Sequence, residues 1–124
     1  MTSGLRLTPR LMHDFYKALS RTPPYGTKGW RLLPADEVVF KVSRTLHLGD
    51  HSYTPRKKDH AIALSELRHG HLHTMLVTLA HEMVHLVQAV EKMETPKAEH
   101  NADFRRRAKI VCRAFGFDPK EFIR

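Results

Sequence analysis

Apolar residues recur at helical spacing through one long stretch of the chain, from Leu72 to Val90. Steps of four and three residues alternate along it, which places the apolar side chains on one face of an α-helix. That face comprises Leu72, Leu76, Leu79, Met83, Leu86 and Val90, and it is widened by Val77, Ala80, Val84 and Val87. Because most of the circumference is apolar, we expect this helix to lie at the centre of the domain.

The pattern before this helix predicts one helix and two strands. Thr8-Pro9 has the cap-plus-proline arrangement that begins helices, and Thr22-Pro23-Pro24 ends the segment. Alternating apolar and polar residues predict a strand from Asp36 to Leu48 and a shorter one from His60 to Leu67. The polar stretch 47–59 is interpreted as a loop, and a hairpin connection is compatible with it.

The pattern after the central helix predicts a further helix and a short turn. Thr95-Pro96 repeats the cap-plus-proline signal, and Gly116 stops the segment. Residues 118–121 resemble a capping box that begins a terminal turn. The order helix, strand, strand, helix, helix predicts an α+β fold, and the length predicts one domain over residues 1–124.

Composition narrows the functional classes. The net charge of +8 favours an acidic partner such as nucleic acid, and a solvated basic surface would give the same charge. The single cysteine, Cys112, excludes an internal disulfide and a Cys-based zinc site, and we expect it to be a core residue in a reducing compartment. Residues 1–10 lack the apolar run of a signal peptide, and no stretch has the uninterrupted length of a membrane span. We therefore expect a soluble, cytoplasmic protein without a membrane partner.

The central helix carries the most informative motif, since residues 81–85 read H-E-x-x-H. Residues four apart lie one turn above each other, so His81 and His85 can offer two imidazole nitrogens to one ion. Glu82 projects beside them and can reach a water on that ion. Partly buried imidazoles and carboxylates need partners, and a metal ion supplies one. This layout is typical of zinc hydrolases.

A third protein ligand has to come from another element. Gln88 and Glu91 occupy the positions where a longer motif would place glycine and histidine. His100 begins a helical face whose apolar members should carry it toward the core, so we expect it to be the third ligand. Glu99 and Asp103 remain alternatives. The apolar members of that face are Phe104, Ala108, Val111 and Phe115.

The other histidines carry no comparable spacing. His69, His71 and His73 could form a separate metal site, but they are interpreted as a polar approach to the central helix, because alternating histidines in a loop give no fixed ligand geometry. Surface positions are expected for the remaining four, His13, His47, His51 and His60. Tyr53 could donate a hydrogen bond to an oxyanion, but nothing in the sequence selects it.

Basic residues form two groups that could follow a phosphate backbone. One group lies on the outward sides of the last long helix and the other lies in the polar loop. Arg113 also belongs to the first group. No aromatic residues alternate with them, so base-specific binding is not indicated. The candidate nucleic-acid contacts are Arg105, Arg106, Arg107, Lys109, Arg56, Lys57 and Lys58.

Three segments together resemble the SprT-like metallopeptidase domain, with the likeness running over residues 62–108. They are 62–65 (Ile-Ala-Leu-Ser), 81–85 (H-E-x-x-H) and 100–104 (His-Asn-Ala-Asp-Phe). The resemblance implies a small zincin-like core of the minimal gluzincin type, with an N-terminal helix, a short sheet, an active-site helix and a following helix that carries the third ligand. It implies one zinc ion per chain on His81, His85 and His100, with Glu82 as general base. Members usually have glycine after the third histidine, where this chain has Asn101.

The function implied is a zinc-dependent metallopeptidase that hydrolyses peptide bonds of a protein or peptide substrate with metal-activated water. The eukaryotic relative Spartan is a DNA-dependent protease for proteins crosslinked to DNA, so the resemblance extends the expected substrates to DNA-associated proteins. The alternative is a basic nucleic-acid-binding module with a structural, non-catalytic zinc site. Structural sites usually fill the fourth coordination position with another protein ligand, and this feature distinguishes the two hypotheses. The sequence does not indicate an oligomeric state.

Overall fold

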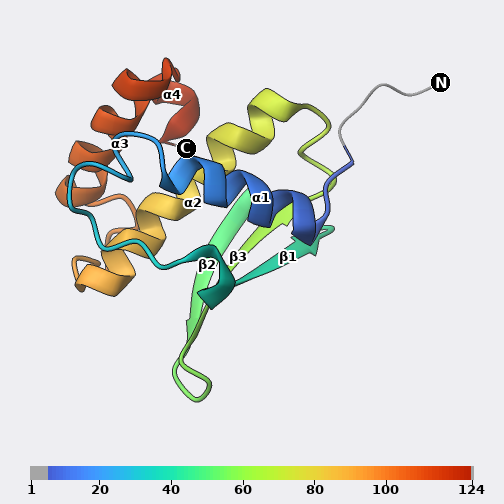
Figure 1. The fold of residues 1–124 in the computed structure, drawn as a ribbon, viewed down its shortest axis with the longest axis horizontal. Coiled ribbons are helices and arrows are strands. Elements are labelled where there is room, and N and C mark those ends of the chain that lie inside the picture. Colours follow the sequence, from blue (N-terminus) through green and yellow to red (C-terminus); the bar gives the residue numbers. More distant parts are fainter. Residues whose placement is uncertain (1–5, 124) are drawn as a thin grey trace.

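The protein consists of a three-stranded sheet with helices packed on one face (Figure 1). The structure is a computed structural model that describes residues 6–123. Residues 1–5, part of the amino-terminal stretch discussed above, lie outside the described residues. The elements are α1 (Pro9–Ser20), the 3-10 turn η1 (Ala35–Glu37), β1 (Val38–Ser43), β2 (Gly49–Thr54), β3 (Asp59–Ser65), α2 (Leu72–Glu91), α3 (Ala102–Phe115) and α4 (Pro119–Phe122). The α+β prediction is confirmed.

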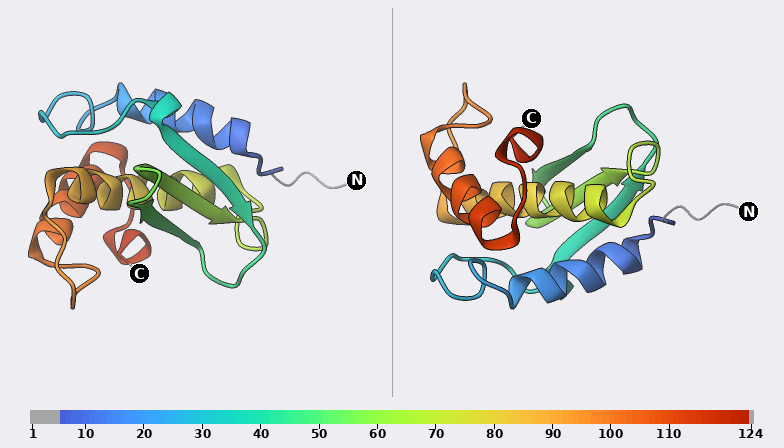
Figure 2. Two further views of the ribbon diagram at one scale, coloured as in Figure 1. Left: turned by 90° about the horizontal axis from the view of Figure 1, so that it is seen from below. Right: turned by 90° about the horizontal axis from the view of Figure 1, so that it is seen from above.

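The strand order is β1-β3-β2, with β1 parallel and β2 antiparallel to the central β3. Ile62 and Leu64 of β3 are fully buried on the face that α2 covers. The antiparallel register pairs His51 with Ile62 and Tyr53 with His60, so these β2 side chains share the helix-covered face. Helix α1 packs against β1 and α2, as the two views in Figure 2 show. The second edge of β2 has no strand partner in the described sheet.

The first residue of strand β2 lies so close to β3 and α2 that it has no room for a side chain. A Cβ atom at Gly49 would lie 2.7 Å from Leu64 Cδ2 and 3.1 Å from Thr78 Cγ2. Thr78 precedes His81 by one turn of α2, so the start of β2 lies beside the H-E-x-x-H segment. The glycine therefore serves close packing of β2 against both β3 and α2.

Several local predictions are confirmed. The Thr8 side chain accepts a hydrogen bond from the Leu11 amide at 3.0 Å and caps α1. Helix α2 spans the predicted central segment, with Leu79, Met83 and Leu86 fully buried. Gly116, at φ 75°, ends α3 as predicted. The predicted core cysteine, Cys112, is buried in α3, and α4 forms the expected terminal turn after Asp118.

Four predictions about elements are wrong. The first strand is shorter than 36–48, because η1 precedes it and residues 44–48 are not strand. The loop predicted at 47–59 contains β2, whose core-facing positions are glycine, histidine and tyrosine rather than aliphatic residues. Leu72 is 45% exposed, since it begins α2. The predicted cap at Thr95-Pro96 does not begin α3; Asn101 caps it instead.

Among residues 6–123, no helix combines the length and apolarity needed to cross a membrane.

Candidate metal centre

Three histidine side chains converge where α2 passes the loop before α3. His81 and His85 lie on one face of α2, and His100 precedes the cap of α3. Each histidine offers a ring nitrogen, and these atoms lie within 4.8 Å of one another. The Nε2 atoms of His81 and His85 are 3.2 Å apart. Two imidazole nitrogens bound to one zinc ion at about 2.0–2.1 Å would lie roughly 3.3 Å apart, so the spacing fits a common metal ion.

The ring of His81 is held by a main-chain contact with α4. Its Nδ1 forms a short hydrogen bond with the main-chain carbonyl of Phe122, in α4. A carbonyl oxygen can only accept, so Nδ1 carries the proton and Nε2 presents its lone pair to the other two histidines. Phe122 thus fixes the tautomer that a metal ligand needs.

The imidazoles are neutral in this environment. Burial lowers the pKa of His81 to about 4 and that of His85 to about 3. Burial also lowers the pKa of His100. Neutral imidazole is the form that binds zinc and other borderline transition metals, and the donor set therefore fits such an ion.

Glu82 lies beside the histidines and is almost fully buried, with 4% of its surface exposed. Its Oε2 is 4.0 Å from His81 Nε2. Burial raises the pKa of Glu82 to about 8, and the negative charges of Asp50 and Glu99 act in the same direction. A cation between the histidines would oppose this shift by favouring the carboxylate. The carboxyl group can therefore hold or release a proton near neutral pH.

These groups line a cavity of about 440 Å³ that lies between β2, α2, α4 and the loop before α3. His51 of β2 also lines it. Its wall includes four further carboxylates, and among the described residues no lysine or arginine lines it. The four are Asp50, Glu94, Glu99 and Glu121. A chain with a net charge of +8 thus surrounds an acidic cavity.

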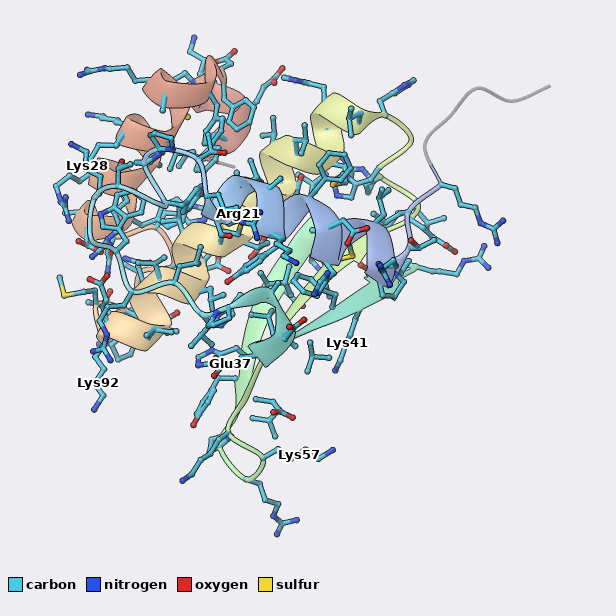
Figure 3. All side chains as sticks on the ribbon, viewed as in Figure 1. Arg21, Lys28, Glu37, Lys41, Lys57 and Lys92 are labelled. Atoms are coloured by element: carbon cyan, nitrogen blue, oxygen red, sulfur yellow. The ribbon has the colours of Figure 1, made fainter. Side chains whose placement is uncertain are left out.

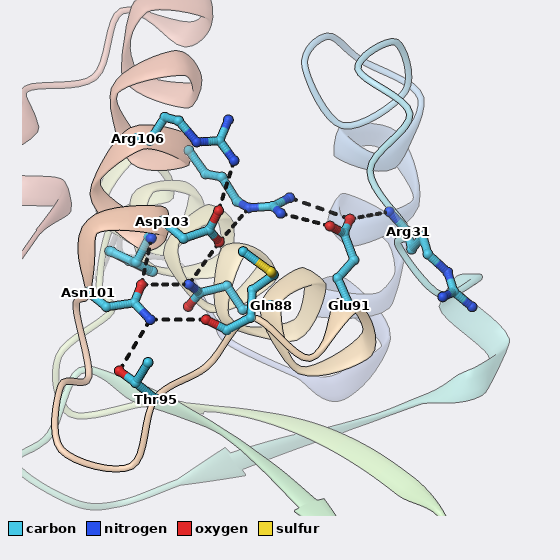
Figure 4. Close-up of polar contacts among 10 residues, drawn as sticks. Arg31, Gln88, Glu91, Thr95, Asn101, Asp103 and Arg106 are labelled. Carbon is cyan, nitrogen blue, oxygen red and sulfur yellow. Dashed lines mark hydrogen bonds and ion pairs between the residues drawn. The ribbon is translucent and has the colours of Figure 1, made fainter.

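His100 precedes α3, and the loop that carries it is held by a polar network around the next residue, Asn101 (Figure 4). The Asn101 side-chain oxygen accepts from the Phe104 amide at 2.9 Å and from Gln88 Nε2 at 2.9 Å. Its side-chain nitrogen donates to the Met93 carbonyl at 3.0 Å. Asn101 therefore ties the loop before α3 both to α3 and to Gln88 of α2. It also supplies a side-chain cap for α3, which glycine at this position would lack.

Replacement of Asn101 by alanine tests this positioning. We expect a loss of about 1–2 kcal/mol in the free energy of unfolding of the metal-free protein, because the helix cap is lost. Metal affinity should fall by on the order of tenfold, because the loop that carries His100 loses its anchor. Urea unfolding and metal titration measure the two effects. Unchanged metal affinity in the variant would show that Asn101 only caps α3.

Arg107 is buried, with 3% of its surface exposed, so its predicted outward position is wrong. Its guanidinium donates to Glu91 Oε1 at 2.7 Å and to Asp103 Oδ2 at 2.8 Å, and it lies 5.2 Å from the ring centre of Trp30. The two carboxylates explain the burial, since a buried charge needs partners. Asp103 is engaged here and not with the histidines, whereas Glu99 lines the cavity.

The Arg107 pair predicts a loss of stability in acid. The hydrogen bond from Arg107 holds the pKa of Glu91 below its usual value of 4.5. Because folding lowers the pKa of Glu91, this stabilisation is complete above the pKa of the unfolded chain. It is lost as the pH falls through the pKa of the folded protein. Urea unfolding of the metal-free protein should show a decline as the pH falls below 4.5, the usual value for Glu91, and Arg107→Met should flatten it. Lys109→Met, at an exposed position of α3, is the matched control; an unchanged slope in Arg107→Met would contradict the assignment.

Other predicted site residues are more scattered. His69 is buried rather than part of a polar approach, and its Nε2 donates to the Leu48 carbonyl at 2.8 Å. His51 and His60 are half-buried rather than on the surface, and Tyr53 packs on His60. The antiparallel pairing of β2 places these residues together, and no sequence spacing could have indicated it.

The basic groups are not brought together. Arg105, Arg106 and Lys109 are exposed on α3. Residues 56–58 form the turn between β2 and β3, and Figure 3 shows Lys57 at its tip, well away from α3. A single nucleic-acid surface through both groups would have to span most of the molecule.

Comparison with known proteins agrees with the site. No curated protein sequence matches the chain. A sequence profile described as the SprT-like family matches residues 12–121, which include all three histidines, Glu82 and the sheet. This match covers most of the chain and accords with the small zincin-like fold and a metallopeptidase-like domain. The chain belongs to the SprT-like family.

Proposed function

We propose that the protein is a zinc-dependent metallopeptidase that hydrolyses peptide bonds in its acidic cavity. The observation that carries the proposal is the convergence of three neutral imidazoles beside the buried carboxyl group of Glu82. Zinc bound by such a set lowers the pKa of a water molecule and polarises a carbonyl group. His81, His85 and His100 would hold the ion.

Glu82 has the properties of a general base. Its carboxyl group is close to the histidines. Burial raises the pKa of this group to about 8 and a bound cation would lower it, so the group can both take and return a proton near neutral pH. Glu82 would accept a proton from the attacking water and pass it to the leaving nitrogen. Because the side chain is almost fully buried, bulk water does not compete for this proton.

The position of β2 suggests how a substrate lies. Residues 49–51 line the cavity, and the second edge of this strand has no partner in the described sheet. An extended peptide could pair with such an edge through main-chain hydrogen bonds. The acidic wall favours segments with lysine or arginine near the cleaved bond. The same wall disfavours phosphate, so DNA would contact the exposed basic residues outside the cavity.

The alternative, a basic nucleic-acid-binding module with a structural zinc site, is supported by the exposed residues of α3 and the β2–β3 turn. It would usually need a fourth protein ligand. Within residues 6–123 the histidine cluster brings together three ligand side chains, which favours a site that a substrate can reach.

The test is cleavage of an unfolded, lysine-rich protein by zinc-loaded and chelator-treated samples, with and without DNA. The peptidase proposal predicts cleavage that requires zinc. Stimulation by DNA would support action on DNA-associated proteins. DNA binding that survives chelation, without cleavage under any condition, would support the binding module and overturn the peptidase.

A further inference from the structure

His51 and His60 form a pair whose geometry differs from that of the metal-binding histidines. His51 Nε2 and His60 Nδ1 are 3.0 Å apart, and the ring centres are 5.2 Å apart with an angle of 18° between the planes. A ring nitrogen lies about 1.1 Å from its ring centre, so the two nitrogens lie almost on the line between the centres. Each nitrogen points directly at the other, so the two cannot share one ion. The contact is an imidazole–imidazole hydrogen bond.

The pair lies at the cavity wall. His51 lines the cavity that holds His81, Glu82 and His85, on the helix-covered face of the edge strand. Its Nε2 is occupied by His60, so Nδ1 is the nitrogen that remains for a ligand. The two nitrogens of an imidazole point in nearly opposite directions, and His60 pairs with Tyr53 further along β2, so His51 Nδ1 faces back toward residues 47–50, which line the cavity.

The surroundings select the tautomer. The cavity wall offers carboxylate acceptors and contains no lysine or arginine among the described residues. A protonated Nδ1 is favoured beside acceptors, which requires that His60 Nδ1 donates to His51 Nε2. Burial, with a smaller contribution from His60, lowers the pKa of His51 to about 4, so the ring stays neutral at neutral pH. His51 then presents one N–H group to the cavity.

Resting on the proposed peptidase function, we propose that His51 is a catalytic residue that donates its Nδ1–H to the substrate carbonyl oxygen, and that His60 is a positioning residue that sets the tautomer. The oxygen gains negative charge as water attacks, so this hydrogen bond strengthens in the transition state. No proton is transferred in the step. His51 is placed for this task because β2 carries it to the cavity rim opposite α2.

The metal-free protein provides the first test. A proton–nitrogen correlation spectrum of the imidazole side chains should show His51 protonated at Nδ1, and His60→Phe should turn His51 into a mixture of tautomers. A parent His51 protonated at Nε2 would overturn the proposal.

Kinetics provide the second test. His51→Phe keeps a ring but lacks the donor, and should lower kcat by about 100- to 1,000-fold with metal content unchanged. His60→Phe should cost less, and adding it to His51→Phe should cost nothing more, because His60 acts through His51. His51→Gln, which retains an N–H donor, should recover part of the rate. His13→Phe, at a histidine on α1 outside the cavity, is the control and should match the parent.

The outcomes separate this inference from the peptidase proposal. If the parent cleaves and His51→Phe cleaves equally fast, the donor assignment is wrong and the peptidase stands. If His51→Phe loses its metal, His51 is a ligand and the donor assignment is again wrong. If the losses of the two single variants add in the double variant, His60 does not act through His51. If the zinc-loaded parent does not cleave at all, the peptidase proposal itself fails.

Discussion

Replacement of Glu82 by glutamine is expected to abolish peptide hydrolysis while the protein keeps its metal. Glutamine has the shape of glutamate but cannot take a proton from water at pH values near neutrality. Loss of a general base typically costs a factor of about 100 to 10,000 in rate. The histidine ligands are untouched, so zinc stoichiometry should equal that of the parent. The measurements are kcat/KM on an unfolded protein substrate and the metal content of the purified variant.

The free energy of unfolding of Glu82→Gln provides a control for its activity. Burial raises the pKa of Glu82 to about 8, which shows that the buried site disfavours the charged carboxylate when no cation is near. A neutral amide should therefore leave the unfolding free energy of the metal-free protein unchanged or higher. Inactivity combined with preserved folding would isolate the proton transfer. A glutamine variant that cleaves as fast as the parent rules out Glu82 as the base.

Replacement of His100 by alanine is expected to weaken metal binding strongly. The substitution removes one of three ligands. Mutation of residues that only support a metal ligand typically lowers metal affinity by about 10- to 100-fold, so we expect a loss of ~100-fold or more here. When metal is in excess over its dissociation constant, a 100-fold loss removes about 2.7 kcal/mol of metal-dependent stabilisation. Zinc titration and thermal unfolding with and without zinc measure the two quantities.

Glu99→Gln is the matched control for His100, because Glu99 is the adjacent residue and also lines the cavity. It should retain metal stoichiometry, since its carboxylate is not part of the histidine cluster. The reverse result, with metal lost in Glu99→Gln and kept in His100→Ala, would make Glu99 the third ligand.

The sequence predicts α2 correctly because the apolar spacing and the H-E-x-x-H motif lie on one continuous helix. The sequence argument places His100 at the start of a helical face, whereas the residue precedes α3, since Asn101 is the cap. Convergence of the three histidines depends on a loop conformation set by the hydrogen bonds that Asn101 accepts from Gln88 and donates to the Met93 carbonyl, which no periodicity encodes.

Strand β2 and the burial of Arg107 show a second limit of sequence patterns. The core-facing positions of β2 are Gly49, His51 and Tyr53, which lack the apolar alternation that signals a strand. Arg107 lies among exposed basic neighbours in the sequence, and only its contacts with Glu91 and Asp103, from two helices, explain its burial. In both cases contacts made in the folded structure, and not the residue type, determine the local structure or burial.

The bond between His81 and the carbonyl oxygen of Phe122 has a consequence for genetics. Since every amino acid carries the same main-chain oxygen, no codon change can delete this acceptor. Saturation mutagenesis at position 122 would report only on how well each ring or aliphatic group fills its buried site. The contribution of the oxygen becomes visible when chemical ligation replaces the following amide by an ester, which makes that carbonyl a poorer acceptor and loosens the imidazole it orients. The same exchange removes the Ile123 N–H that donates to the Pro119 carbonyl, so the imidazole has to be compared with the state of α4.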